Sequence, residues 1–202
     1  MSAISAKLVK ELREKTGAGM MDCKKALQES NCKMEEAIVK LRQKGLASAD
    51  KKNSRATTEG LIESYIHTGN KCKYLFSFNC ETDFVARRSE FQNLAKDIAM
   101  QIASSSDVKF VSIKDIPEEF VKNEQAIELG KSDLDKKPPE IKEKIIAGRI
   151  EKRLKEMSLL DQPFIKNNDI TIEELIKERI SLLGENIQVK RFHKYVLGEV
   201  TE

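Results

Sequence analysis

The chain has 202 residues, of which 40% are hydrophobic and 34% charged, a composition typical of a globular protein with a sizeable core. No apolar run reaches the roughly 20 residues needed to cross a bilayer, and the first residues resemble neither a secretory signal nor a transit segment. We therefore expect the protein to work in the compartment where it is made. The net charge of +3 is uneven, since residues 1–60 hold 13 Lys and Arg against 8 Asp and Glu. This mild asymmetry permits a basic N-terminal module that faces an acidic partner, and is too small for a dedicated nucleic-acid binder.

The cysteines form no C-x-x-C pair, and only two histidines, His67 and His193, could complete a metal site. We expect reduced, buried or half-buried thiols, with a zinc site as the less favoured alternative. The cysteines are Cys23, Cys32, Cys72 and Cys80.

Three short helices are predicted within residues 1–45, because apolar side chains recur there at helical spacing. Gly17 is suited to a left-handed cap after the first helix. The second helix is expected from about Asp22, and Gly45 is expected to end the third. Residues 46–58 are small and polar, which predicts a linker and makes the N-terminal bundle a separate module.

Met20 and Met21 fall at the turn between the first two helices. They could form a flexible contact surface, or one of them could fill the core of the bundle.

The first half of the core is predicted over residues 59–116. Residues 61–67 and 71–78 flank a Thr-Gly-Asn turn, which indicates a β-hairpin. A strongly periodic helix follows from Ser89 to about Ser105, and residues 108–111 could add a short strand. An antiparallel sheet with a helix across one face is the expected core.

Residues 117–157 predict a helical hairpin, with one helix from Pro117 and another from Pro138. Their narrow apolar stripe favours a two-helix coiled coil that projects from the core over one that lies flat on the sheet. Residues 158–202 complete the core with an extended segment, a helix that begins after Thr171, and a final strand. The fold class is therefore α+β.

The segment from residue 79 to residue 86, Asn-Cys-Glu-Thr-Asp-Phe-Val-Ala, is a polar stretch between a predicted strand and a predicted helix. Segments held at such junctions often carry function. Phe84 could be a contact residue there, or plain core.

No catalytic constellation is found. The sequence has neither a G-x-x-x-x-G-K-[ST] loop nor a G-x-G-x-x-G motif after a strand, and its two histidines lack triad-like or metal-binding neighbours. This profile favours an interaction protein over an enzyme, with no catalytic residue, no metal and no cofactor.

Two long stretches carry a family resemblance. Residues 8–27 and residues 79–86 resemble the two signatures of translation elongation factor Ts, and the resemblance continues through residues 162–164 and 184–187. That family exchanges guanine nucleotide on the GTPase elongation factor Tu. The resemblance implies a UBA-like N-terminal bundle, a core and a helical hairpin.

The resemblance also implies roles for particular residues. Those that would contact the nucleotide-binding domain of elongation factor Tu are Lys10, Arg13, Met20 and Met21. In the second signature, Asp83 and Phe84 would be the working residues, with Thr82 and Val85 fixing their shape. The family's phenylalanine wedges between partner histidines and disturbs the partner's magnesium site.

The chain is most similar to short-form members of the cyanobacterial and plastid branch. It has one sheet-and-helix core unit where long members have two, and the C-terminal helix usual in the family has no counterpart after Leu197. The resemblance implies a homodimer in a two-plus-two complex with elongation factor Tu, with no direct nucleic acid and no membrane. A plastid stroma is the favoured location, and a bacterial cytoplasm is the alternative. The competing functions are an RNA-associated adaptor, which would bind RNA in a salt-sensitive way, and a small zinc enzyme.

Overall fold

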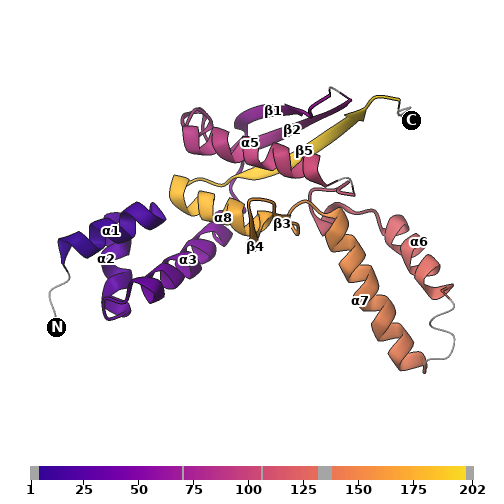
Figure 1. The fold of residues 1–202 in the computed structure, drawn as a ribbon, viewed down its shortest axis with the longest axis horizontal. Coiled ribbons are helices and arrows are strands. Elements are labelled where there is room, and N and C mark those ends of the chain that lie inside the picture. Colours follow the sequence, from indigo (N-terminus) through magenta and orange to yellow (C-terminus); the bar gives the residue numbers. More distant parts are fainter. Residues whose placement is uncertain (1–4, 70, 106, 132–137, 199–202) are drawn as a thin grey trace. The chain divides into compact units, whose positions relative to one another are not determined.

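The computed structural model describes residues 5–69, 71–105, 107–131 and 138–198. Its contacts divide the chain into two compact units. Unit 1 comprises Met1–Gly60, Asn79–Phe91 and Glu174–Gln188, and unit 2 comprises Leu61–Phe78, Gln92–Glu173 and Val189–Glu202. The combination of separate helices and an antiparallel sheet is that of the predicted α+β class (Figure 1).

Unit 1 begins with three helices, as predicted. They are α1 (Ala6–Thr16), α2 (Met20–Glu29) and α3 (Met34–Asp50). Gly17 caps α1 in the left-handed region at φ 68°, and its N–H donates to the Arg13 carbonyl over 2.7 Å. Leu12 and Leu27 are completely buried between the helices. The resemblance of this bundle to a UBA domain stays a prediction.

The predicted end of the third helix at Gly45 is wrong, because α3 continues through this glycine to Asp50. Gly45 is buried against α8 (Ile172–Leu183), and a residue without a side chain allows this close approach. Arg42 pairs with Glu174 of α8 over 3.4 Å, and Lys177 pairs with Asp50 over 2.9 Å. Of the predicted linker, only residues 51–58 lie outside helices and strands.

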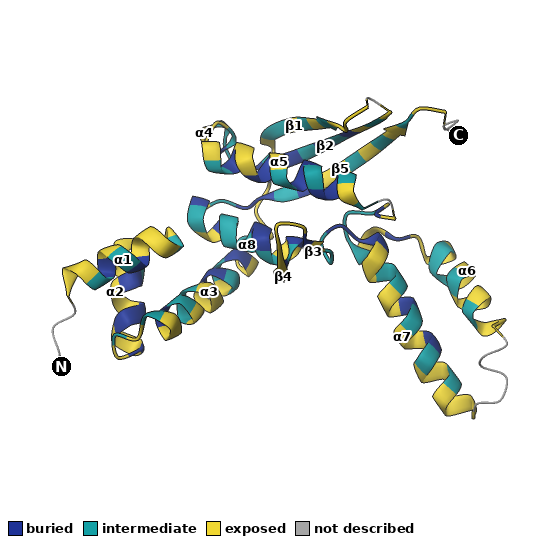
Figure 2. Cartoon of the chain, viewed as in Figure 1, coloured by how far each residue is buried: buried dark blue, intermediate teal, exposed yellow. Residues whose placement is uncertain are grey.

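The main sheet has three strands in the order β1 (Glu59–Ile66), β2 (Cys72–Cys80) and β5 (Gln188–Val196). The N–H of His67 donates to the Cys72 carbonyl where the β1–β2 hairpin closes, and Leu197 donates to Lys71 at the end of β5. The helix α5 (Ser89–Ser104) runs across one face of the sheet (Figure 1). Alternate residues of β2 are buried, namely Tyr74, Phe76, Phe78 and Cys80, whereas Cys72 at the start of the strand is only half-buried; Figure 2 shows the alternation along the strand.

Unit 2 differs from the prediction near residue 110. The expected strand over residues 108–111 is reduced to a single parallel bridge between Phe110 and Ser158. A second antiparallel sheet, which was not predicted, joins β3 (Pro163–Phe164) to β4 (Asn167–Thr171). Gln101 of α5 fixes β3, because its side chain donates to the Pro163 carbonyl over 3.1 Å and accepts from the Ile165 N–H over 2.9 Å.

The predicted hairpin consists of α6 (Glu118–Leu129) and α7 (Pro139–Met157), after a short 3-10 turn, η1 (Ile113–Asp115). Ile146 and Ile150 of α7 are buried and pack against Val121. Its projection as a coiled coil stays a prediction. Within the described ranges, no helix is both long and apolar enough to span a membrane.

Candidate partner-binding site

Residues 82–85, the predicted contact motif, form the first turn of a short helix, α4 (Asp83–Ala86). Thr82 caps this helix, and its hydroxyl accepts from the Val85 N–H over 3.4 Å. Val85 is buried, whereas 80% of the Phe84 side chain is exposed. The interpretation of Phe84 as a core residue is therefore wrong, and the turn presents a large aromatic ring to solvent.

Two exposed ion pairs are formed by residues close to Phe84 in the sequence. Asp83 pairs with Arg87 over 3.0 Å, across one turn of α4. Arg88 pairs with Glu90 over 2.7 Å, and its hydrogen bond lowers the pKa of that carboxyl to about 2. Because these ion pairs are exposed to solvent, they stabilise the turn only weakly.

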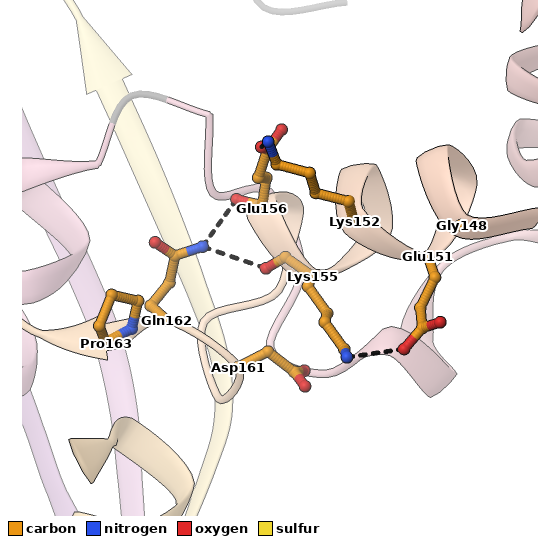
Figure 3. Close-up of a pocket in the computed structure, with 8 residues that line it drawn as sticks. All are labelled: Gly148, Glu151, Lys152, Lys155, Glu156, Asp161, Gln162 and Pro163. Atoms are coloured by element: carbon orange, nitrogen blue, oxygen red, sulfur yellow. Dashed lines mark hydrogen bonds and ion pairs between the residues drawn. The ribbon is translucent and has the colours of Figure 1, made fainter. Parts of the chain in front are cut away.

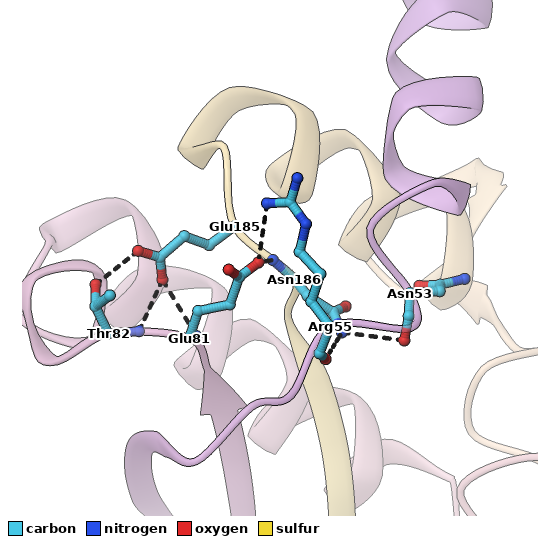
Figure 4. A network of polar contacts seen from close by, with 6 residues as sticks. All are labelled: Asn53, Arg55, Glu81, Thr82, Glu185 and Asn186. Carbon is cyan, nitrogen blue, oxygen red and sulfur yellow. Dashed lines mark hydrogen bonds and ion pairs between the residues drawn. The ribbon is translucent and has the colours of Figure 1, made fainter.

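The α4 turn is attached to the loop after α8 by a carboxylate (Figure 4). Glu185 accepts hydrogen bonds from the N–H of Glu81 over 3.2 Å and from the N–H of Thr82 over 3.0 Å. The Thr82 hydroxyl donates to the same carboxylate over 2.6 Å. Three donors on two successive residues therefore converge on one side chain, 103 residues away from Thr82 in the sequence.

A second set of bonds joins this loop to the segment after α3 (Figure 4). Asn186 is completely buried, and its side-chain amide donates to the carbonyls of Asn53 over 3.2 Å and Arg55 over 2.8 Å. Its backbone N–H donates to the Glu81 side chain over 2.6 Å, and Arg55 pairs with that carboxylate over 3.5 Å. The segments at residues 53–55, 81–82 and 185–186 are thus one hydrogen-bonded cluster within unit 1.

Cys80 directly precedes Glu81 of this cluster in the sequence. It is completely buried, and its thiol donates to the Thr82 carbonyl over 3.1 Å. Burial, and then the charge of Glu185, raise the pKa of the thiol to about 11. Cys80 is therefore a protonated, structural thiol at neutral pH.

The residues predicted to make N-terminal contacts lie on the first two helices of unit 1. Lys10 and Arg13 are exposed on α1. Met20 and Met21 begin α2, with 45% and 65% of their side chains exposed, so neither fills the bundle core. All four side chains are accessible to a partner.

A shallow groove beside α7 in unit 2 is lined mainly by charged and polar side chains, and no large apolar residue is among the described residues that line it (Figure 3). Both of its basic side chains are paired with carboxylates, since Lys155 pairs with Glu151 over 2.7 Å and Lys152 with Glu156 over 3.9 Å. In the part of the chain that the structure describes, no three His, Cys, Asp or Glu residues are grouped as metal ligands. The cysteines are free thiols, two buried and two half-buried.

The sequence did not indicate Glu185, Asn186 or Arg55 as site residues. The available signal was a pair of polar residues between the helix-ending Gly184 and an apolar strand. Polar side chains in a short connection between two apolar elements often form hydrogen bonds with backbone groups. Glu185 and Asn186 are such a pair, so their sequence position suggests bonds of this kind.

Comparisons with known proteins match one family over nearly the whole chain. The sequence model of a family described as Elongation factor TS matches residues 3–199. The chain is 65% identical to the chloroplastic elongation factor Ts of Rhodomonas salina over 199 residues, which cover 98% of this chain and 91% of the relative. It is 60% identical over 202 residues to the elongation factor Ts of Synechocystis sp. (strain ATCC 27184 / PCC 6803 / Kazusa), covering 100% of this chain and 93% of the relative. The elongation factor Ts of Synechococcus sp. (strain JA-3-3Ab) is 62% identical, covering 99% of this chain and 71% of the relative.

Proposed function

The chain belongs to the elongation factor Ts family, and from that premise we propose that it is a guanine-nucleotide exchange factor rather than an enzyme. It binds elongation factor Tu–GDP, disturbs the magnesium site of that GTPase and promotes GDP release during translation elongation. The observation that carries this proposal is the exposure of Phe84, 80% of whose side chain faces solvent on a turn anchored at both ends.

The mechanism needs no covalent chemistry in this chain. Mg²⁺ in the partner bridges the nucleotide phosphates to the protein. A factor that binds best to the partner without nucleotide must weaken nucleotide binding by the same ratio, because the two equilibria are linked. Phe84 supplies the differential contact, since an aromatic side chain buries a large area with few rotatable bonds. Asp83, beside it, contributes a charge to the same contact.

The N-terminal helices supply the docking contact. Lys10 and Arg13 provide positive charge, and Met20 and Met21 provide adaptable apolar area. Charges at the edge of an interface mainly raise the association rate and the specificity. Docking through α1 and α2 and displacement by Phe84 are therefore separable steps.

The protein forms a homodimer, and two copies bind two molecules of elongation factor Tu. Ile62 and Ile66 lie on one face of β1, with 73% and 54% of their side chains exposed, and 52% of Tyr195 on β5 is exposed. Exposed apolar residues on both edge strands of one sheet suit an interface between copies. The complex requires neither nucleic acid nor a membrane.

The working compartment is the plastid stroma, with a bacterial cytoplasm as the alternative. Chloroplastic and cyanobacterial relatives of similar identity support this assignment. No cofactor enters the proposal, because the only metal involved is the partner's magnesium.

Release of fluorescent GDP from elongation factor Tu tests the proposal. The purified chain should accelerate release in a saturable way, and excess Mg²⁺ should reduce the acceleration. No acceleration at saturating concentration would overturn the proposal. Salt-sensitive RNA binding in place of exchange would favour the adaptor function instead.

A further inference from the structure

We propose that Glu185 is a positioning residue for nucleotide exchange: its carboxylate braces the turn that carries Phe84, so that the ring meets the partner at a fixed position. This inference rests on the proposed exchange function. It concerns a residue outside both contact motifs, which touches the turn rather than the partner.

The brace consists of three bonds from two adjacent residues. Glu185 accepts from the N–H of Glu81, from the N–H of Thr82 and from the Thr82 hydroxyl, with distances of 3.2, 3.0 and 2.6 Å. Hydrogen bonds to an ionised acceptor are roughly twice as strong as neutral ones. A single side chain therefore fixes both the backbone and the side chain at the start of α4.

The hydroxyl of Thr82 transmits this constraint into the turn. It has one proton, which it donates to Glu185, and its lone pair accepts from the Val85 N–H over 3.4 Å. Donation to the carboxylate thus orients the lone pair toward Val85. Phe84 lies between the two residues that this hydroxyl joins.

The position of the Phe84 ring depends on the brace, because the ring has few packing contacts that would fix it. With 80% of its side chain exposed, the ring has little packing of its own, and its location follows from the backbone of α4. Buried Val85 anchors the turn on one side, and the bonds to Glu185 anchor it on the other. A wedge held in advance loses less conformational entropy when it enters the partner.

The brace is itself held in place. Glu185 precedes Asn186, which is completely buried and bonded to the backbone of Asn53 and Arg55. The Glu81 carboxylate in turn accepts a hydrogen bond from the Asn186 N–H over 2.6 Å (Figure 4). The loop after α8 is therefore a fixed support rather than a flexible arm.

The proposal predicts that loss of the brace lowers the rate of exchange and leaves the affinity for the partner nearly unchanged. In Glu185→Gln, one oxygen remains for the two backbone N–H groups that share Oε2, but the acceptor is no longer charged, and the amide nitrogen in place of Oε1 cannot accept from the Thr82 hydroxyl. The docking contacts on α1 and α2 are unchanged, so the concentration of factor at half-maximal GDP release should change little. The plateau rate should fall by about tenfold, because a small misplacement of a working group has effects of that order.

Variants of Thr82 test the same contact by changing the donor instead of the acceptor, and they remain informative if Glu185→Gln does not fold. Thr82→Val removes the hydroxyl with little change in shape, and should lower the plateau; Thr82→Ser retains the hydroxyl and should recover much of it. The double variant Thr82→Val, Glu185→Gln should lose little more than the single variants, because both remove the same bond between the Thr82 hydroxyl and Glu185. Glu118→Gln is the matched control, since that side chain is 93% exposed on the hairpin.

Amide hydrogen exchange of residues 79–86, measured without partner, separates failure of the brace from failure of the exchange function. In Glu185→Gln these amides should exchange faster, with circular dichroism and melting temperature close to wild type. An unchanged plateau in both Glu185→Gln and Thr82→Val, or unchanged amide protection in Glu185→Gln, would overturn the proposal. If the wild type does not release GDP, the exchange function is wrong, and the amide measurement still decides whether Glu185 braces the turn.

Discussion

Gly45 of α3 lies directly against Ser181 of α8, and a Cβ atom added to Gly45 would be 3.0 Å from the Ser181 Oγ and 3.2 Å from its Cβ. Real side chains seldom approach so closely, so these helices meet at a distance that only glycine allows here. The contact attaches the C-terminal half of α3 to α8 within unit 1. Two ion pairs of Arg42, to Glu174 over 3.4 Å and to Glu178 over 3.3 Å, support the same contact.

Gly45→Leu should lower the free energy of unfolding by about 1–3 kcal/mol, the usual cost of overpacking a close contact. This loss exceeds the gain of roughly 1 kcal/mol that leucine brings to a helix interior. Urea denaturation followed by circular dichroism measures it. Gly148→Leu on α7 is the matched control, because a Cβ there would meet nothing within 4 Å. A Gly45→Leu protein as stable as the Gly148→Leu protein would contradict the close packing.

The failure to predict α3 has a physical reason. Glycine near the end of a periodic segment is normally a helix terminator, and nothing local distinguishes Gly45 from that common case. Its actual role depends on Ser181, which is distant in sequence. By contrast, the burial of alternate β2 residues and the periodicity of α5 are local patterns, and the sequence predicted both elements closely.

The missed strand β4 has a similar explanation. It begins Asn167-Asn-Asp, residues that favour turns, and its pairing comes from Pro163 opposite Thr171 and Phe164 opposite Asn167. The site likewise contains residues that a local pattern predicts and residues that are brought together only by the fold. A contiguous motif indicated Thr82–Val85, whereas Glu185, which holds that motif, is 103 residues from Thr82, and its local sequence does not show that the two residues are in contact.

Phe84→Ala should reduce the plateau of GDP release at least tenfold, since the residue that enters the partner is removed. The melting temperature should stay near the wild-type value, because 80% of this side chain is already exposed. Stopped-flow GDP release and thermal denaturation measure the two effects. Phe78→Ala provides the contrast, because completely buried Phe78 should cost about 3–5 kcal/mol of stability. A Phe84→Ala protein that unfolds would show that the ring supports the fold.

Arg13→Gln should weaken association with the partner by about fivefold to tenfold, the effect of losing one favourable charge at an interface. The plateau rate should be preserved, because Phe84 and its turn are unchanged. Titration of the factor against GDP release gives both values, and the salt dependence of binding should become less steep. Lys122→Gln, which removes a 74% exposed positive charge from the hairpin, is the control. Equal affinity of the Arg13 variant and the wild type would argue against docking through α1.

The thiol of Cys80 should react slowly with alkylating agents until the pH is high. Burial, then the charge of Glu185, raise its pKa from 9.0 to about 11, and the thiolate is the reactive form. Because the folded pKa is raised, the associated stability is fully present below pH 9 and is lost as the pH rises through 11. Peptide mass analysis after timed alkylation measures the rate at each pH. Half-buried Cys32 provides an internal comparison and should react faster at pH 8. Rapid alkylation of Cys80 at pH 8 would show that the α4 turn opens readily.

Ile62→Lys should convert the proposed dimer to a monomer. Ile62 has 73% of its side chain exposed on β1, and Ile66 lies on the same face two pleats along. A lysine in an apolar interface must lose its hydration without gaining a partner, which is costly. Sedimentation at several protein concentrations should therefore give a mass of two chains for the wild type and one for the variant.

The control for this prediction is Ile127→Lys, which places the same charge on a 59% exposed position of α6. If association depends on the sheet, this variant should remain a dimer, because α6 belongs to the hairpin. A wild-type mass of one chain at all concentrations would contradict the dimer, and dissociation of the Ile127 variant in place of the Ile62 variant would move the interface to the hairpin. Since Ile62 is distant in sequence from the Phe84 motif, the monomer should retain GDP release per chain, and a loss of exchange on dissociation would mean that the partner bridges two copies.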